Sequence, residues 1–440
     1  MMRRSFFIVG MALATSSLFA QGPTVSPGGQ PTINQFAERY VRLALALGQH
    51  DPDYVDAYYG PAEWKTEVAA EKKSLGEIQQ TAHDLSAALL QTRRPTSDID
   101  RLRFDFLQRQ LAALEARTDI VQGEKKSFDD EARALYDAAP PTFPEEHFED
   151  ILAQLEKKIP GQGPLSQRYE EWHKAFIIPT DKLDTVFQLA IKECRARSLA
   201  HIKLPPNEGF KVEYVTNKPW GGYNWYKGDY QSVIQVNTDL PAYIDRAIDL
   251  AAHEGYPGHH VYNALLEKNL VREHNFVEFS IYPLFSPQSL IAEGTANFGR
   301  EVVFNKAERM MFEKNVLWPA AGLDPGRAEE YYAVQDMTRE LSYAANEAAR
   351  KLVNGEIDSK ATVSWLQKYA LMDEARAQQR VRFIQRYRSY VINYNLGEDI
   401  VRSYIEKKGG TPEQPAKRWH EFELLLSAPH LPSELEQTIR

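Results

Sequence analysis

The segment HEGYPGHH, residues 253–260, contains three histidines and a Pro-Gly pair that determines how the backbone runs between them. Two imidazoles on a straight helix can bind one ion when they stand four residues apart, because such positions share a face about 6 Å apart. Here the fourth position after His253 is Pro257, and the next histidines are His259 and His260. In a continuous helix His260 would lie about 10 Å further along the axis, and His259 would point about 120° away. Because proline removes a helix hydrogen bond and glycine accepts unusual dihedral angles, the Pro-Gly pair predicts a break that lets the histidines meet.

The chain around this stretch predicts a mainly α fold with one small antiparallel β-sheet next to the histidine helix. Apolar residues recur every three or four positions from Ile33 onward, and this helical periodicity returns after Pro241 and persists to the end. Between residues 210 and 237, aromatic and β-branched residues alternate in FKVEYV, GYNWY and SVIQVN, which glycine and proline turns separate. The last of these segments, SVIQVN at residues 232–237, lies directly upstream of the histidine helix.

The N-terminus has the pattern of an export signal. Two arginines precede an apolar stretch, and small residues follow up to Ala20, so residues 1–20 are predicted to be a signal peptide. Residues 21–32 are rich in glycine and proline without apolar periodicity and are predicted to be a flexible leader. We therefore expect a periplasmic or secreted protein, exported by either the general or the twin-arginine route.

A second break in the helical pattern lies at residues 159–164, which contain two prolines and two glycines. Such a segment cannot continue a helix. It either separates an N-terminal helical subdomain, residues 33–160, from a second domain, residues 161–440, or forms a loop within one helical body.

Composition excludes several classes of partner and ligand. Acidic residues outnumber basic ones by 61 to 52, so we expect no nucleic-acid partner, which would require a concentrated basic surface. After the first twenty residues no apolar run is long enough to cross a bilayer, and we expect no membrane contact after signal removal. Cys194 is the only cysteine, so we expect no internal disulfide and a metal site made of nitrogen and oxygen ligands. No pattern in the sequence indicates an oligomeric state.

A second motif, AEGTANF at residues 292–298, places Glu293 34 residues after His259. The two motifs together resemble an uncharacterised bacterial domain family grouped with the gluzincin metallopeptidases, whose members carry HExxPGHxxQ and a later EGWA-type motif. The chain departs from this pattern at Thr295, where tryptophan is common, and at Asn263, where glutamine is common. We expect both departures to alter the shape of the pocket rather than the metal ligands.

The resemblance implies a multi-helix zincin-like architecture, with residues 161–440 as a gluzincin-like catalytic domain. SVIQVN would be either the edge strand that pairs with an extended peptide or an ordinary sheet edge. The resemblance also implies a zinc centre with assigned roles. His253, His259 and Glu293 would bind Zn²⁺, with water in the fourth position. Glu254 would act as general base on this water, whose pKa zinc lowers towards about 7, and would pass the proton to the leaving amine. Asn297, one turn after Glu293, would hydrogen-bond a ligand.

His260 has three possible roles at this point. It could replace His259 as the metal ligand, donate a hydrogen bond to the transition state, or support the turn through hydrogen bonds. We favour His259 for the metal, because the family pattern specifies that histidine.

A donor is also needed for the carbonyl oxygen of the substrate, on which negative charge develops. The candidates are Arg388, Tyr390 and Tyr394, in the phenol-rich segment YRSYVINY at residues 387–394. Any of them could bind the oxyanion or a substrate carboxylate, although tyrosines at such spacing are often core residues. The stretch from Tyr54 to Trp64 is a further candidate for the roof of the cleft.

These observations predict an exported zinc metallopeptidase that cleaves short peptides. One alternative keeps the zinc but changes the bond to an amide, ester or lactone of a non-peptide metabolite. Another is a helical binding protein that merely holds a metal, which has no use for an unligated Glu254 beside the ion. The sequence does not distinguish endopeptidase from exopeptidase action.

Overall fold

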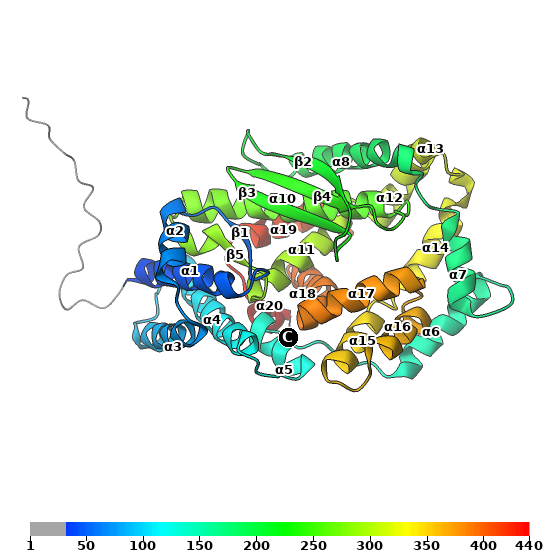
Figure 1. Cartoon of the computed structure of the whole chain (residues 1–440). Coiled ribbons are helices and arrows are strands. Elements are labelled where there is room, and N and C mark those ends of the chain that lie inside the picture. Colours follow the sequence, from blue (N-terminus) through cyan, green and yellow to red (C-terminus); the bar gives the residue numbers. More distant parts are fainter. Residues whose placement is uncertain (1–31, 440) are drawn as a thin grey trace, which may run out of the picture.

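The computed structural model describes residues 32–439 (Figure 1). The predicted signal peptide and all but the last residue of the leader lie outside the described residues. The first helix begins at Ile33, as the periodicity predicted, because Thr32 and Gln35 form a capping box at its N-terminus. Among the described residues, no helix is long and apolar enough to cross a membrane.

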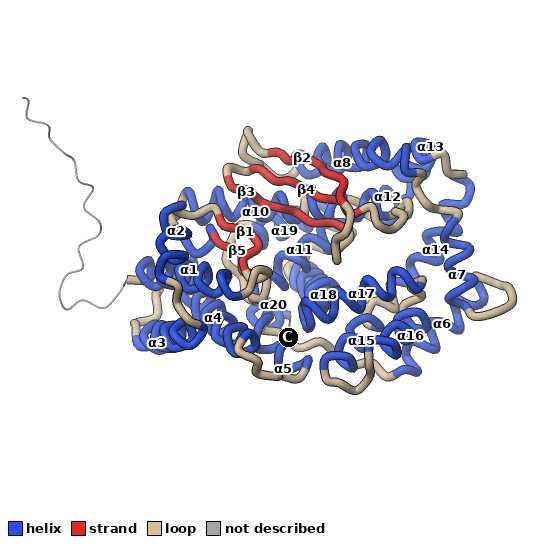
Figure 2. The backbone as a smooth tube through the Cα atoms, viewed as in Figure 1, coloured by secondary structure: helices blue, strands red, loops and turns tan. Residues whose placement is uncertain are grey.

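The fold is mainly α, which confirms the predicted class (Figure 2). The N-terminal helices are α1 (Ile33–His50), α2 (Ala62–Glu71), α3 (Leu75–Gln91), α4 (Asp98–Val121), α5 (Phe128–Tyr136) and α6 (Glu145–Lys158). The middle of the chain contributes α7 (Leu165–Lys174), α8 (Leu183–Leu199), α9 (Arg246–Leu250), α10 (His259–Leu266), α11 (Pro287–Val303), α12 (Lys306–Phe312) and α13 (Trp318–Ala321). The C-terminal helices are α14 (Ala328–Arg339), α15 (Ala344–Val353), α16 (Ser359–Tyr369), α17 (Glu374–Tyr387), α18 (Ile392–Lys407), α19 (Pro415–Leu426) and α20 (Pro432–Ile439).

Two small sheets accompany the helices. The first pairs β1 (Val55–Tyr58) with β5 (Ile281–Pro283) in antiparallel orientation. The second consists of β2 (Gly209–Val215), β4 (Gln231–Asn237) and β3 (Gly222–Gly228), in that spatial order. In Figure 1 the three-stranded sheet lies on one side of α11, and α17 and α18 lie on the other.

The three-stranded sheet corrects two sequence predictions. β3 pairs with β4 in the predicted antiparallel orientation, but β2 runs parallel to β4, so the sheet is mixed. SVIQVN belongs to the middle strand, β4, and the two edge strands are β2 and β3. The connection from β2 crosses the end of β4, where the side-chain amide of Asn237 donates to the carbonyl oxygens of Lys218 and Trp220. Alternation of residue types predicts strands but does not predict this crossing, which depends on tertiary contacts.

The core runs through most of the described chain. One hydrophobic cluster includes residues from α1 to α20. The segment 160–164 is a loop between α6 and α7, and both helices contribute to a second cluster with residues of α14 to α16. Helices α11 and α18 touch backbone to backbone, because a Cβ atom on Gly294 would overlap the carbonyl group of Gly397. This close approach brings the helix of Glu293 against the segment that contains Tyr390 and Tyr394.

Candidate metal centre

The helix break predicted in HEGYPGHH is present. Helix α9 continues into the π-helical turn η2 (Ala251–Gly255), Tyr256 is extended with φ −116° and ψ 114°, and α10 starts at His259. Gly258 is required at this corner, since an added Cβ atom would overlap the carbonyl oxygen of His253. The reversal brings His259 back towards His253, which a continuous helix would not allow.

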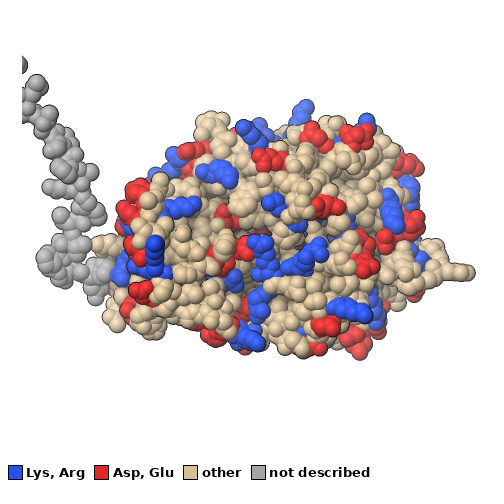
Figure 3. Space-filling view, in the orientation of Figure 1, with Lys and Arg blue, Asp and Glu red and all other residues tan. Residues whose placement is uncertain are grey.

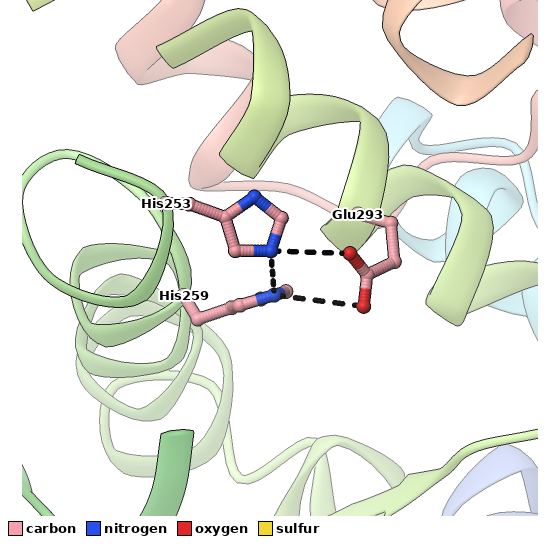
Figure 4. A group of neighbouring side chains, drawn as sticks. All are labelled: His253, His259 and Glu293. Carbon is pink, nitrogen blue, oxygen red and sulfur yellow. Dashed lines mark hydrogen bonds and ion pairs between the residues drawn. The ribbon is translucent and has the colours of Figure 1, made fainter. Parts of the chain in front are cut away.

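Three side chains converge at this corner (Figure 4). The Nε2 atoms of His253 and His259 are 3.1 Å apart, and carboxylate oxygens of Glu293, on α11, lie 3.2 Å and 3.6 Å from them. Ligand atoms about 2.0–2.1 Å from a tetrahedral zinc ion are about 3.3 Å from one another. The observed distances bracket this value. The three side chains therefore fit a small cation that prefers nitrogen and oxygen ligands.

Asn297 determines which nitrogen of His253 is free. The Asn297 amide nitrogen donates to the backbone oxygen of Tyr394 at 2.7 Å, so its oxygen faces the Nδ1 atom of His253 at 3.0 Å. Nδ1 must donate this hydrogen bond, which leaves the lone pair of Nε2 directed at the cluster. Asn297 thus occupies the supporting position that the sequence predicted for it.

The electrostatics of the cluster favour a cation. Burial opposes charge on both partners, yet the imidazoles hold the pKa of Glu293 well below its usual range. Glu293 and Glu254 in turn raise the pKa of His259 to about 9, again against the effect of burial. One oxygen of Glu293 accepts a hydrogen bond from the Tyr390 hydroxyl at 2.7 Å, and the other is buried without a hydrogen bond among residues 32–439. A buried carboxylate with an unused oxygen is suited to a positive partner.

Glu254 lies beside the cluster but is not bound by it. Its side chain lines the cavity, and its carboxyl group makes no hydrogen bond to the residues that the structure describes. Burial raises its pKa above the usual value, although the two imidazoles oppose this. The backbone is held by Asn224, whose amide nitrogen donates to the Glu254 carbonyl oxygen at 2.7 Å. Gly222 leaves room for the carboxyl group, since an added Cβ atom would lie 2.9 Å from Glu254 Oε1.

His260 points away from the cluster into a separate hydrogen-bonded group. Its Nε2 atom lies 3.0 Å from Glu208, and its Nδ1 atom lies 2.9 Å from the hydroxyl of Ser232. The Tyr256 hydroxyl donates to the same Glu208 carboxylate at 2.5 Å, and Arg195 forms an ion pair with it. Of the three roles left open by the sequence, this geometry matches support of the turn.

The segment 387–394 divides its candidate residues among different partners. Tyr390 binds Glu293, whereas the Tyr394 hydroxyl lines the cavity and makes no hydrogen bond to any described residue. The predicted place of Arg388 in the site was wrong. Its side chain forms an ion pair with Glu131 and donates to the backbone oxygen of Lys126, away from the cluster. Its backbone is left-handed, with φ 52°, because α17 ends at Tyr387. Arg388 therefore does not lie on the same side of the segment as Tyr390 and Tyr394.

One cavity of about 1280 Å³ contains the cluster, Glu254 and Tyr394. Asp56, from the stretch proposed as a roof, also lines it. Two further lining residues, Arg246 and Arg380, were missed by the sequence analysis. The sequence contained one signal for Arg246, which stands seven residues before His253 and so shares its helix face two turns earlier. No sequence spacing places Arg380 here, since it comes from α17.

No family model matches the chain, and no curated protein matches it. A likeness to solved structures was found, and one with a TM-score above 0.5 concerns the fold. A candidate lipoprotein from Colwellia psychrerythraea is 14% identical, with a TM-score of 0.51, over 94% of this chain and 77% of that one. A candidate lipoprotein of unknown function from Shewanella oneidensis is 13% identical, with a TM-score of 0.40, over 93% of this chain and 81% of that one. At such identity the first likeness concerns the fold alone.

Proposed function

We propose that this protein is an exported zinc-dependent hydrolase that cleaves short peptides. The observation that carries the proposal is the placement of Glu254, a buried carboxyl group without hydrogen bonds to the described residues, beside the convergent side chains of His253, His259 and Glu293. A structural metal site needs only its ligands, whereas hydrolysis also needs a base within reach of the attacking water. The proposal of export rests on the signal pattern of residues 1–20.

Each residue of the site has a chemical task in this proposal. His253, His259 and Glu293 would hold the zinc ion, which supplies an activated water and a positive charge beside the substrate carbonyl group. The water oxygen bonds to the carbonyl carbon, and Glu254 accepts the proton that the water loses. The carbon–nitrogen bond then breaks, and Glu254 passes this proton to the leaving amine. Tyr394 donates a hydrogen bond to the carbonyl oxygen as negative charge develops on it.

A peptide is favoured as substrate by the strand next to the site. β3 is an edge strand, and no strand of the described chain pairs with its outer side. Its first residues, Gly222 to Asn224, line the same cavity as Glu254. An extended peptide could add to this edge through backbone hydrogen bonds, which would hold a peptide bond in register beside the cluster. This strand takes the role that the sequence analysis gave to SVIQVN.

The test is a comparison of wild type with Glu254→Gln on a mixture of synthetic peptides, after both proteins are loaded with zinc. We expect the wild type to cleave peptides and the variant to bind zinc without cleaving. Zinc binding without peptide cleavage by either protein would refute the peptidase proposal and favour a different amide or ester bond. Absence of zinc binding by the wild type would refute the hydrolase proposal altogether.

A further inference from the structure

Two arginines of the cavity have no anionic partner in the part of the chain that the structure describes. Arg246, on α9, and Arg380, on α17, are half-buried, and neither guanidinium group makes a hydrogen bond or ion pair within residues 32–439. Most other arginines that line this cavity are paired, for example Arg309 with Asp249 and Arg402 with Glu301. Arg339, which also lines it, is exposed to solvent. Figure 3 shows Lys and Arg side chains gathered in the middle of this face, between the three-stranded sheet and α17.

Both guanidinium groups line the cavity that also contains Glu254 and Tyr394. Burial and the charge of Arg246 both lower the pKa of Arg380. Two unpaired like charges in one partly buried cavity favour an anion from elsewhere. Guanidinium groups suit a carboxylate, which they can bind through two parallel hydrogen bonds.

The position of Arg246 relative to β3 indicates which part of a bound peptide would supply this anion. Arg246 lies at the start of β3, because a Cβ atom on Gly221 would be 3.8 Å from its guanidinium group. The other end of β3 meets the N-terminal segment, since a Cβ atom on Gly228 would be 2.7 Å from that of Tyr59. Asp56, on β1 in this segment, has a buried oxygen without a hydrogen bond among the described residues. Burial raises the pKa of Asp56 to about 7, so this carboxyl group is not a fixed negative charge, and the unpaired charge along the strand edge is the positive charge at its start.

The positive charge at the start of β3 selects one direction for a bound peptide. A peptide antiparallel to β3 would have its carboxyl end at the start of the strand, by the arginines. A parallel peptide would instead bring its positively charged amino end to the arginines. Glu254 lies beside Gly222, and Arg246 lies beside Gly221, so little strand separates the reacting bond from the arginines. At a rise of about 3.3 Å per residue, this separation corresponds to about one or two substrate residues.

We propose that Arg246 and Arg380 bind the free C-terminal carboxylate of the substrate, so that the enzyme releases one or two residues from the C-terminus of a peptide. The inference rests on the proposed function and adds where the peptide is cut. It also predicts that a peptide without a free carboxylate is a poor substrate, whatever its sequence.

The experiment uses one N-acetylated peptide in two forms, as the free acid and as the C-terminal amide, with the zinc-loaded full chain. We expect kcat/KM to be 10- to 100-fold higher for the free acid, and mass spectrometry to show loss of one or two C-terminal residues. Equal cleavage of both forms, or cuts in the middle of the peptide, would overturn the inference and leave the proposed function intact. Cleavage of neither form, nor of any other peptide, would overturn both.

Variants test which residues are responsible. Arg246→Gln and Arg380→Gln should each reduce the preference for the free acid at least 10-fold, mainly through a higher KM for the free acid. Arg382→Gln is the matched control, because Arg382 is an exposed arginine on the same helix. If a glutamine variant does not fold, Arg246→Lys and Arg380→Lys keep the charge without the paired hydrogen bonds and should lose part of the preference. A preference unchanged in all of the folded variants would overturn the assignment.

Discussion

His259 and His260 are neighbours in the chain, each lies next to a buried carboxylate, and their surroundings differ in one respect. The group around His260 is closed, because Ser232, Tyr256 and Arg195 supply the hydrogen bonds that the imidazole and Glu208 require. The cluster around His259 is open, because the atoms that would bind an ion face one another and one oxygen of Glu293 has no hydrogen bond among residues 32–439.

This difference distinguishes a supporting hydrogen-bond network from a site that binds a metal ion. Both groups contain histidine and glutamate at short distance, so composition alone would not separate them. The two groups differ in whether their buried polar atoms all have hydrogen-bond partners. Buried polar atoms without partners destabilise the fold unless a bound ligand interacts with them. We therefore expect changes on the His259 side to act on metal and turnover, and changes on the His260 side to act on stability.

The largest expected effect follows from removing a proposed ligand. Glu293→Ala should abolish both zinc binding and turnover, because two imidazoles alone leave the ion with too few protein ligands. Zinc content per chain, measured by atomic absorption after dialysis, should fall from about one to near zero. A variant that keeps its zinc would show that the ion is held elsewhere.

The next effect concerns chemistry without loss of the ion. Glu254→Gln should lower kcat about 10²- to 10⁴-fold, the usual contribution of a general base, while zinc content stays at about one per chain. The measurement is steady-state kinetics on a cleaved peptide, with metal analysis of the same sample. Turnover within a few-fold of wild type would remove Glu254 from its assigned role.

A smaller pair of effects separates Tyr394 from Tyr390. Tyr394→Phe should reduce kcat about 10²- to 10³-fold, because its hydroxyl group would stabilise the developing oxyanion. Tyr390→Phe should instead weaken zinc binding by about 10- to 100-fold, because its hydroxyl group holds Glu293 in place. Competition with a chelator measures the second effect. Identical behaviour of the two variants would contradict the separation.

The smallest effect on activity is expected on the closed side. Glu208→Gln should keep zinc and turnover but lose about 1–3 kcal/mol of unfolding free energy, because its partners keep only part of their hydrogen bonding. Although burial opposes it, His260, Tyr256 and Arg195 lower the pKa of Glu208 to about 2. A lowered folded-state pKa gives stability that is present above the unfolded pKa and is lost as pH falls towards 2.

Denaturant unfolding at pH 7 and at pH 3 measures this difference. The wild type should lose more stability between these values than Glu208→Gln, which has no carboxyl group to titrate at this position. Loss of zinc from Glu208→Gln at pH 7 would show instead that the two sides are not independent.

Local geometry explains which predictions were confirmed by the structure. The helix start at Ile33 depends on the adjacent Thr32 cap, and the break in HEGYPGHH depends on proline and glycine within it. The convergence of Glu293 was implied by a family resemblance, and the close contact of Gly294 with Gly397 shows how the packing achieves it.

The features that the sequence could not supply depend on the tertiary arrangement. The order of the strands depends on a connection that crosses β4, which residue alternation does not encode. Arg388 was misplaced because one left-handed residue after α17 reverses the expected direction. Arg380 was missed because its partners in the cavity lie more than a hundred residues away in the chain, on the segment of Arg246 and Glu254.

The most direct test of the central claim is anomalous diffraction at the zinc edge from crystals of the zinc-loaded protein. We predict one anomalous peak per chain, within bonding distance of the Nε2 atoms of His253 and His259 and of the Glu293 carboxylate, with Glu254 beside it and unbound. A peak at His260 and Glu208, or no peak at the three predicted ligands, would contradict the account.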